Sequence, residues 1–218
     1  VKEYLHEEVV WHVARDSTDI EGREKPQSQP KAPHPKRPLG RPRKGEVRAP
    51  APEKRIQRQY RQSAAEAIAE LPTQCDIGVK RDAKGRTHRW TGYKFHVDVG
   101  DGGIPLAALT TSASMHDSQA AIPLMKLTAA RVSSFYELMD SAYDARLISQ
   151  LSHELGHVAI VDAKHRGKPL WKPEMEPDRA RRYRHRTEAE RFHSDLKDNH
   201  GGREVRVRGQ AKVHTHLM

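Results

Sequence analysis

The chain has 218 residues and only 35 % hydrophobic residues, which suits one sizeable domain or two small ones with part of the chain outside a packed core. Its formal net charge of +10 favours a polyanionic partner, foremost nucleic acid, because each phosphate that a cation neutralises releases condensed counterions. The single cysteine excludes an intrachain disulfide and a cysteine-based zinc cluster, and the lack of a long apolar run or signal-peptide pattern predicts a cytoplasmic protein with no membrane partner.

The first part of the chain predicts one strand followed by a linker. Residues 8–14 (EVVWHVA) are rich in β-branched and aromatic types, which predicts a buried strand that ends just before Asp16. Residues 24–53 are dense in proline, lysine and arginine, so they cannot bury enough surface to offset the entropy of ordering. We therefore expect a basic, extended, Pro-rich linker over residues 24–60, inserted after the first strand.

This linker contains Gly-Arg-Pro-Arg-Lys, which includes Arg41 and Arg43. The segment is similar to an AT-hook, in which extended Arg-Pro backbone lies in the narrow minor groove of A·T-rich DNA. A basic linker that makes nonspecific phosphate contacts explains the same residues more simply, because short basic motifs often occur by chance. The sequence leaves both interpretations open.

The rest of the chain alternates strands and helices. A helix is expected over residues 63–70, and three strands over 76–80, 92–99 and 104–111 are expected to form an antiparallel meander. Further helices are expected over 118–130, with His116-Asp117-Ser118 as its cap, and over 145–155 and 178–198. Further strands are expected over 135–139 and 157–161. This order predicts an α/β fold, a sheet with helices on its faces.

Two acids occupy the ends of predicted strands. Asp16 and Asp140 each follow an apolar run. Because strand tips converge at one edge of a sheet, these acids can meet, and Mg²⁺ prefers such hard oxygen ligands. Two ions held in this way suit phosphodiester chemistry, since they activate the attacking oxygen and stabilise the leaving one. A lone Asp after a strand is more often a turn or cap residue, so the interpretation depends on a third acid.

The last predicted helix supplies that acid. It contains the pattern Y-x2-R-x3-E-x6-K, formed by Tyr183, Arg186, Glu190 and Lys197. On a helix, steps of 3, 4 and 7 residues place the four side chains on one face. The carboxylate can then take a metal ion while the cations hold phosphate oxygens. Helix physics alone explains the pattern equally well as a solvated helix with ion pairs.

Taken together, these segments resemble the DDE transposases of bacterial insertion sequences that carry a Y-R-E-K signature. The matching segments are Arg15-Asp16-Ser17-Thr18 with Arg23-Glu24-Lys25-Pro26, Leu138-Met139-Asp140-Ser141-Ala142-Tyr143-Asp144, the signature helix, and Arg208-Gly209 with Lys212. Ala142 stands where the family usually has Gly. The segments are collinear over nearly the whole chain, so we expect one RNase H-like DDE domain over residues 1–218, present as a fragment without an end-binding region.

The resemblance implies an RNase H-like mixed sheet flanked by helices, with Mg²⁺, or Mn²⁺ as a substitute, bound by the catalytic acids Asp16, Asp140 and Glu190. The remaining signature residues would contact phosphates of the transposon ends and target DNA: Tyr183, Arg186 and Lys197. It also implies strand cleavage followed by strand transfer by a homodimer on DNA, in the bacterial cytoplasm at the nucleoid.

Several alternatives stay open at this point. Asp19, Asp144 and Glu188 can replace the three acids within the same pattern. A nuclease of the same fold that does not transfer strands needs the same carboxylates, and a DNA-binding remnant of a decayed element needs none of them.

Two further features favour plain structural explanations. The run His153-Glu154-Leu155-Gly156-His157 matches the H-E-x-x-H motif of zinc proteases, but Gly156 predicts that the helix ends inside the motif. Trp90 and Trp171 can stack on DNA bases, although packing in the core or at its rim is the more common role of tryptophan.

Overall fold

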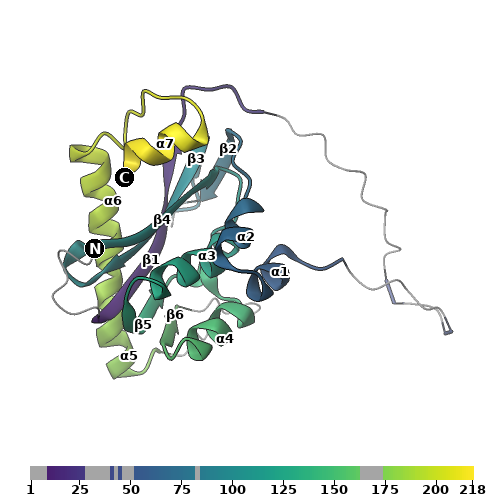
Figure 1. Cartoon of the computed structure of the whole chain (residues 1–218), viewed down its shortest axis with the longest axis vertical. Coiled ribbons are helices and arrows are strands. Elements are labelled where there is room, and N and C mark those ends of the chain that lie inside the picture. Colours follow the sequence, from purple (N-terminus) through teal and green to yellow (C-terminus); the bar gives the residue numbers. More distant parts are fainter. Residues whose placement is uncertain (1–8, 28–39, 42–43, 46–51, 82–83, 163–173) are drawn as a thin grey trace.

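The computed structural model describes residues 9–27, 40–41, 44–45, 52–81, 84–162 and 174–218. Within them, a six-stranded mixed sheet is flanked by helices on both faces (Figure 1), which confirms the fold class expected from the sequence. The predicted positions Arg43 and Trp171 lie outside the described residues, whereas Arg41 lies within them and is exposed.

The sheet combines an antiparallel half with a parallel half. Its strands are β1 (Val9–Glu21), β2 (Asp76–Arg81), β3 (Thr87–Gly100), β4 (Pro105–Ser112), β5 (Ser133–Met139) and β6 (Val158–Val161). Their order is β2-β3-β1-β5-β6, and β4 also pairs with β3. Strands β2, β4 and β1 all run antiparallel to β3, and β5 runs parallel to β1 and β6. The predicted antiparallel pairing is confirmed, but the predicted meander is wrong, because β2 and β4 pair with successive parts of the same edge of β3, opposite β1.

The first strand is longer than the sequence predicts. Instead of ending before Asp16, β1 continues to Glu21, so Asp16 lies inside the strand. The polar half of β1 stays extended because nine residues of β1 pair with β3, from Val13 opposite Gly100 to Glu21 opposite Gly92. The parallel pairing of β1 with β5, in contrast, ends at Arg15 opposite Met139. Asp16 and Asp140 are therefore the next residues on two neighbouring strands.

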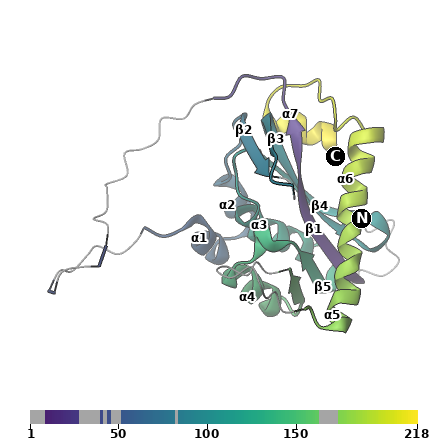
Figure 2. The same cartoon turned by 180° about the vertical axis from the view of Figure 1, so that it is seen from behind.

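Helices from two parts of the chain cover the two faces of the sheet. On one face, α6 (Thr187–Asn199) and α7 (Gln210–Leu217) pack their apolar side chains against β1, β3 and β4. Figure 2 shows α6 running alongside β1. The other face is covered by α3 (Ser118–Ala129) and α4 (Arg146–Glu154), with α2 (Ala64–Ala69) and α1 (Arg55–Arg61) packed outside them.

Several helix ends follow directly from local chemistry. The Ser63 side chain accepts a hydrogen bond from the Glu66 backbone and Glu66 returns one to Ser63, which starts α2. After α4, Gly156 adopts a φ of 82°, a conformation that favours glycine and stops the helix. The helix over 118–130 forms as expected, but the Asp117 side chain does not cap it.

Three helical features differ from the sequence-based expectation. The end of the range 24–60, expected to be extended, forms α1, because Gln59 is buried and donates to the backbone oxygen of Gln119 at 2.8 Å, which docks α1 on α3. The signature helix is not one α-helix: α5 (Pro177–Tyr183) and α6 are joined by a 3-10 helical turn, Arg184–Arg186. Helix α7 was not predicted, because only Val213 and Leu217 in it are buried.

Candidate active site

The point where the pairing of β1 with β5 ends brings two of the predicted acids together. Asp140 directly follows β5, and its Oδ1 accepts a hydrogen bond from the backbone N–H of Ala142 at 2.8 Å, which fixes the carboxylate at the strand end. Burial raises the pKa of Asp16 to about 6, and the negative charge of Asp140 acts in the same direction, while the backbone of Ser17 and the Arg186 guanidinium oppose the shift. A pair of like charges in a partly dry site is the arrangement that attracts a cation.

The guanidinium of Arg186 connects the third acid to this pair. Its Nη1 lies 3.6 Å from Asp16 Oδ2, and its Nη2 donates to Glu190 Oε1 one helical turn further on. Burial lowers the pKa of Arg186, but Tyr183, Asp16, Glu190 and Asp140 together raise it above its ordinary value. One cation thus interacts with all three predicted acids.

The other two signature residues lie at different distances from the acids. The Tyr183 ring centre is 5.8 Å from the Arg186 guanidinium carbon. Burial raises the pKa of the Tyr183 hydroxyl to about 12. Arg186 opposes this shift, and the nearby acids Asp162, Asp140 and Asp16 add to it. Lys197 instead lies further along β1, where its Nζ is 3.1 Å from Asp19 Oδ1. The structure therefore brings Tyr183 into the acid cluster and places Lys197 beside it.

A family model described as a transposase DDE domain matches residues 11–218. The chain belongs to this family. The six-stranded mixed sheet with flanking helices agrees with the RNase H-like core of a DDE transposase. Comparisons with curated proteins and with solved structures found no match. Among the described residues of this transposase domain, no helix has the length and apolar character needed to span a membrane.

A buried ion triad lies directly beneath the acids of the transposase domain. Arg15 is fully buried, and its Nη2 lies 2.6 Å from Asp98 Oδ2 on β3 and 3.3 Å from Glu137 Oε1 on β5. Thr128 of α3 also donates to Asp98 Oδ2 at 2.6 Å. These contacts tie β1 to both neighbouring strands at the residue before Asp16. Sequence reasoning missed the triad, although charged residues inside apolar strand runs were its visible signal.

A second polar cluster surrounds Asp117 at the start of α3. Its Oδ1 accepts a hydrogen bond from Ser17 Oγ at 2.8 Å and lies 2.9 Å from Lys94 Nζ. Burial would raise the pKa of Asp117, but His96 and Lys94 hold it below its ordinary value. The hydroxyl of Tyr143 is buried without a hydrogen-bond partner among the described residues. Burial is the main cause that raises its pKa, and the negative charges of Asp117 and Asp16 add to the shift. The sequence offered Asp117 only as a helix cap.

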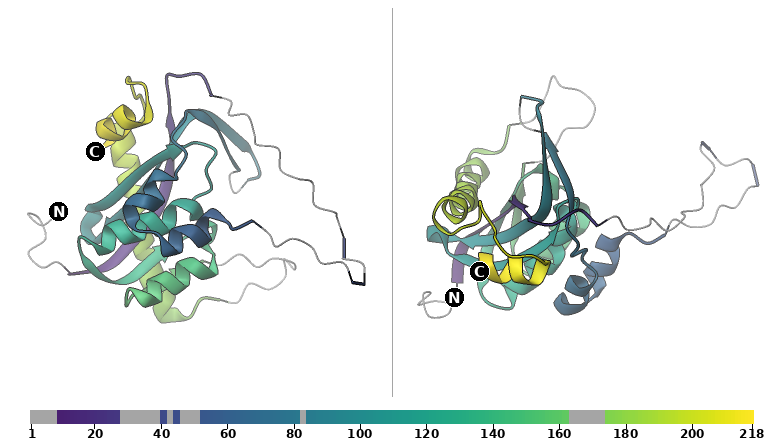
Figure 3. Two further views of the ribbon diagram at one scale, coloured as in Figure 1. Left: turned by 45° about the vertical axis from the view of Figure 1, so that its right-hand side comes forward. Right: turned by 90° about the horizontal axis from the view of Figure 1, so that it is seen from above.

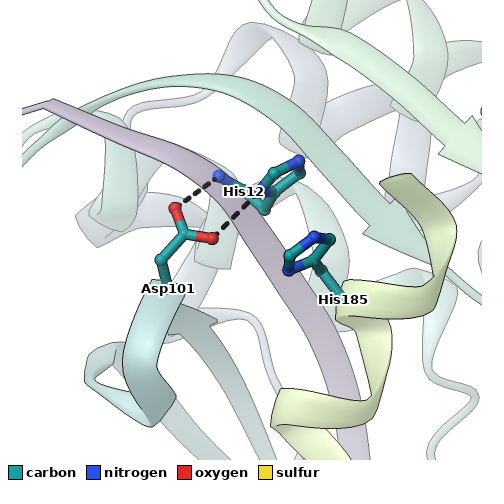
Figure 4. Close-up of side chains that lie close together, drawn as sticks. All are labelled: His12, Asp101 and His185. Atoms are coloured by element: carbon teal, nitrogen blue, oxygen red, sulfur yellow. Dashed lines mark hydrogen bonds and ion pairs between the residues drawn. The ribbon is translucent and has the colours of Figure 1, made fainter. Parts of the chain in front are cut away.

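A third group joins β1 to the turn between α5 and α6. His12 Nδ1 lies 2.9 Å from Asp101 Oδ1, and the His12 ring stacks on His185 with centres 4.2 Å apart and planes 4° apart (Figure 4). Ligand atoms of the three residues lie within 4.8 Å of one another, as in a metal site. However, imidazole binds a metal through a lone pair in the ring plane, and one ion cannot lie in two stacked parallel planes. As placed, the group acts as a clasp: it holds His185, and with it the turn that carries Arg186, against β1.

The remaining sequence features have structural explanations. His153 belongs to α4 while His157 follows the glycine that ends it, so the two histidines do not share one helical face and the motif is not a zinc-protease site. Trp90 is only 5 % exposed and its indole N–H donates to the Tyr93 backbone oxygen at 2.9 Å, so its role is packing.

Proposed function

We propose that this domain is the catalytic domain of an insertion-sequence transposase of the Y-R-E-K group, and that it cleaves and joins DNA at a site formed by Asp16, Asp140 and Glu190. The observation that carries the proposal is the proximity of two carboxylates, Asp16 within β1 and Asp140 after β5, to a guanidinium that also contacts Glu190. The neighbouring acids lie outside the group that Arg186 joins: Asp19 is paired with Lys197, and Glu188 with Arg191 at 2.8 Å.

The residues at this site fit a divalent metal ion. Burial and the negative charge of Asp140 both raise the pKa of Asp16. A cation bound between the Asp16 and Asp140 carboxylates would relieve their repulsion. Both side chains offer hard oxygen atoms, which suit Mg²⁺ and its substitute Mn²⁺. Bound ions would supply Lewis-acid activation of the attacking oxygen and stabilisation of the leaving oxygen.

The other residues of the site would position the DNA. Arg186 has donors in a planar fork that can hold two nonbridging phosphate oxygens, and Tyr183 lies beside it with a hydroxyl that stays protonated at neutral pH. Lys197 would contact the backbone further along β1. In the first step, water attacks the phosphorus and the bond to the 3′ oxygen breaks, which leaves a 3′-hydroxyl. In the second step, that hydroxyl attacks a target phosphodiester and displaces its 3′ oxygen.

The first test is nicking of supercoiled plasmid by the protein with Mg²⁺ or Mn²⁺. Asp16→Asn, Asp140→Asn and Glu190→Gln should each reduce the nicking rate by at least roughly 100-fold, the scale on which active-site electrostatics acts. The matched controls Asp144→Asn and Glu188→Gln remove a charge from the same two segments and should retain activity. Loss of cleavage in Asp19→Asn but not in Asp16→Asn would overturn the assignment.

A strand-transfer assay separates a transposase from a nuclease of the same fold. A duplex with a recessed 3′-hydroxyl transposon end should be joined to a target plasmid by a transposase, whereas a nuclease only cuts it. Two ends must be brought together, so we also propose that the protein acts as a homodimer on DNA. Comparing A·T-rich with G·C-rich duplexes tests whether the segment around Arg41 and Arg43 reads the minor groove or only contacts phosphates.

A further inference from the structure

The hairpin formed by β2 and β3 extends beyond the rest of the sheet. Residues Tyr93–Val99 of β3 pair with β4, and residues Gly92–Gly100 pair with β1 on the other side. Residues Thr87–Gly92, in contrast, pair with β2. The far end of the hairpin is therefore a two-stranded ribbon, which projects from the body of the sheet in Figure 3. Such a ribbon gains little stability from its own two strands in water.

The ribbon is strongly basic and carries exposed apolar residues. Between Ile77 and Thr91 the sequence has five Lys or Arg and a single acid, Asp82. The five cations are exposed in the structure: Lys80, Arg81, Lys84, Arg86 and Arg89. Ile77 and Val79 are 47 % and 55 % exposed, so the ribbon combines positive charge with apolar surface.

One face of the ribbon lies against the candidate active site. Lys80 and His88 are opposite each other in the β2–β3 pairing, so their side chains point to the same face. His88 Nε2 is 3.7 Å from Asp19 Oδ2, and the positive charge of Lys80 acts on Asp16 and lowers its pKa in opposition to burial. The other face presents Val79 and Arg89, which are also opposite each other.

We infer that the β2–β3 ribbon is a DNA-binding arm that holds the duplex flanking the phosphodiester cleaved at Asp16 and Asp140. The inference rests on the proposed function, and it adds a surface outside the signature residues. A two-stranded ribbon has the dimensions to enter a major groove, its cations complement the phosphate backbone, and its apolar side chains can contact thymine methyl groups. Its position beside Asp19 and Asp16 continues the line of contacts that Lys197 and Arg186 begin.

Charged residues on an exposed strand can instead serve only to prevent pairing with another chain. These two roles differ in the salt dependence of DNA binding. We would measure the affinity of a fluorescent 30-base-pair duplex from low to moderate salt for the wild type and for Lys80→Gln/Arg81→Gln/Arg89→Gln. A matched control, Lys54→Gln/Arg61→Gln/Arg203→Gln, removes three exposed cations, one just before α1, one at its end and one after α6.

If the ribbon holds DNA, its variant should lose affinity by roughly tenfold or more and reduce the slope of log Kd against log salt by about 2 to 3, close to one per lost phosphate contact. The control should keep the wild-type slope. A ribbon variant that is folded in thermal unfolding but keeps the wild-type affinity and slope would refute the inference, and its self-association in sedimentation would identify the ribbon as a protective edge.

A second measurement does not depend on charge removal. The chain has one cysteine, Cys75, which is buried, so His88→Cys introduces a single accessible thiol. That thiol should crosslink to DNA carrying a disulfide tether within a few nucleotides of the nicked position, and not to a tether two helical turns away. Equal crosslinking at both tethers also counts against the arm. If the ribbon binds DNA but the protein does not nick DNA with a metal ion, this inference stands and the proposed catalytic function fails. If the protein nicks DNA but the ribbon substitutions leave DNA binding unchanged, the catalytic function stands and this inference fails.

Discussion

Replacing Asp16 by asparagine should make the protein more stable at neutral and alkaline pH, although it removes a proposed catalytic group. The pKa of Asp16 is raised from 3.8 to about 6, chiefly by burial, and its side chain is 21 % exposed, so solvent screens the shift only weakly. At 1.36 kcal/mol per pKa unit, ionised Asp16 costs the folded state about 3 kcal/mol. Asparagine has the same shape without the charge.

The sign of the effect defines its pH window. Below pH 3.8 Asp16 is protonated in the folded and the unfolded chain and costs nothing, and above pH 6 it is charged in both and the full cost applies. The stability advantage of Asp16→Asn should therefore grow between about pH 4 and pH 6. At pH 8 it should approach 3 kcal/mol, a rise in Tm of about 6–12 °C for a chain of this size.

The assay is urea unfolding of the wild type and Asp16→Asn from pH 4 to pH 8, without divalent ions. The stability contributions of His96 and His193 also change with pH, since burial lowers their pKa values to about 4 and about 3, but they are common to both proteins and cancel in the difference. Exposed Asp144→Asn serves as the control and should change stability by less than about 0.5 kcal/mol. A wild type as stable as Asp16→Asn at pH 8, or a difference that does not vary with pH, would refute the reasoning.

Mg²⁺ should reduce the stability advantage of Asp16→Asn over the wild type by about half if Asp16 helps to hold the ion. A ligand that binds only the folded state stabilises it by about 1.4 kcal/mol at ten times its Kd. The wild type should gain this free energy and Asp16→Asn should gain much less. An equal gain in both proteins would place the ion elsewhere.

Three further substitutions test the support of the site, each by urea unfolding. Arg15→Met leaves two buried carboxylates without their cation and should cost about 3–5 kcal/mol at pH 7, whereas a cost below about 1 kcal/mol would mean the triad is not an ion network. Gly92→Ala places a Cβ 2.2 Å from a backbone oxygen of β1 at a φ of 149°, and overpacking alone should cost about 1–3 kcal/mol. His193→Leu should reduce the stability loss between pH 6.5 and pH 4, roughly 3 kcal/mol in the wild type, because burial lowers the pKa of His193 so that its protonation favours the unfolded chain.

The sequence predicted those parts of the fold that local patterns determine. The strand over 157–161 and the helix over 63–70 were confirmed nearly to the residue, because an apolar run and a capping box specify them locally. The second half of β1 was missed, since its polar residues are held extended by pairing with β3. The paired residues of β3 lie some 80 positions later in the sequence, so no local pattern reveals them. Helix α1 was missed for the same reason, because its stability comes from docking on α3.

The candidate site shows the same division. Asp16 and Asp140 were predicted to meet because each follows an apolar strand, and Arg186 and Glu190 because they are four residues apart on a helix. The partners of Asp117 could not be predicted, since Ser17 and Lys94 reach it only once the register of β1, β3 and β4 is fixed. The clasp of His12 and His185 likewise depends on where the signature segment crosses β1.

Register is also what protects the site. Successive residues of β1 face opposite sides of the sheet, so Arg15 reaches buried acids on β3 and β5 while Asp16 reaches Arg186. A slip of one residue would turn Asp16 toward Asp98 and expose Arg15, which exchanges a buried ion pair for two buried like charges. The triad therefore penalises the one-residue slip that would misplace the proposed catalytic carboxylate. This explains why a charged residue is retained in the centre of the sheet, where an apolar side chain would pack with less desolvation.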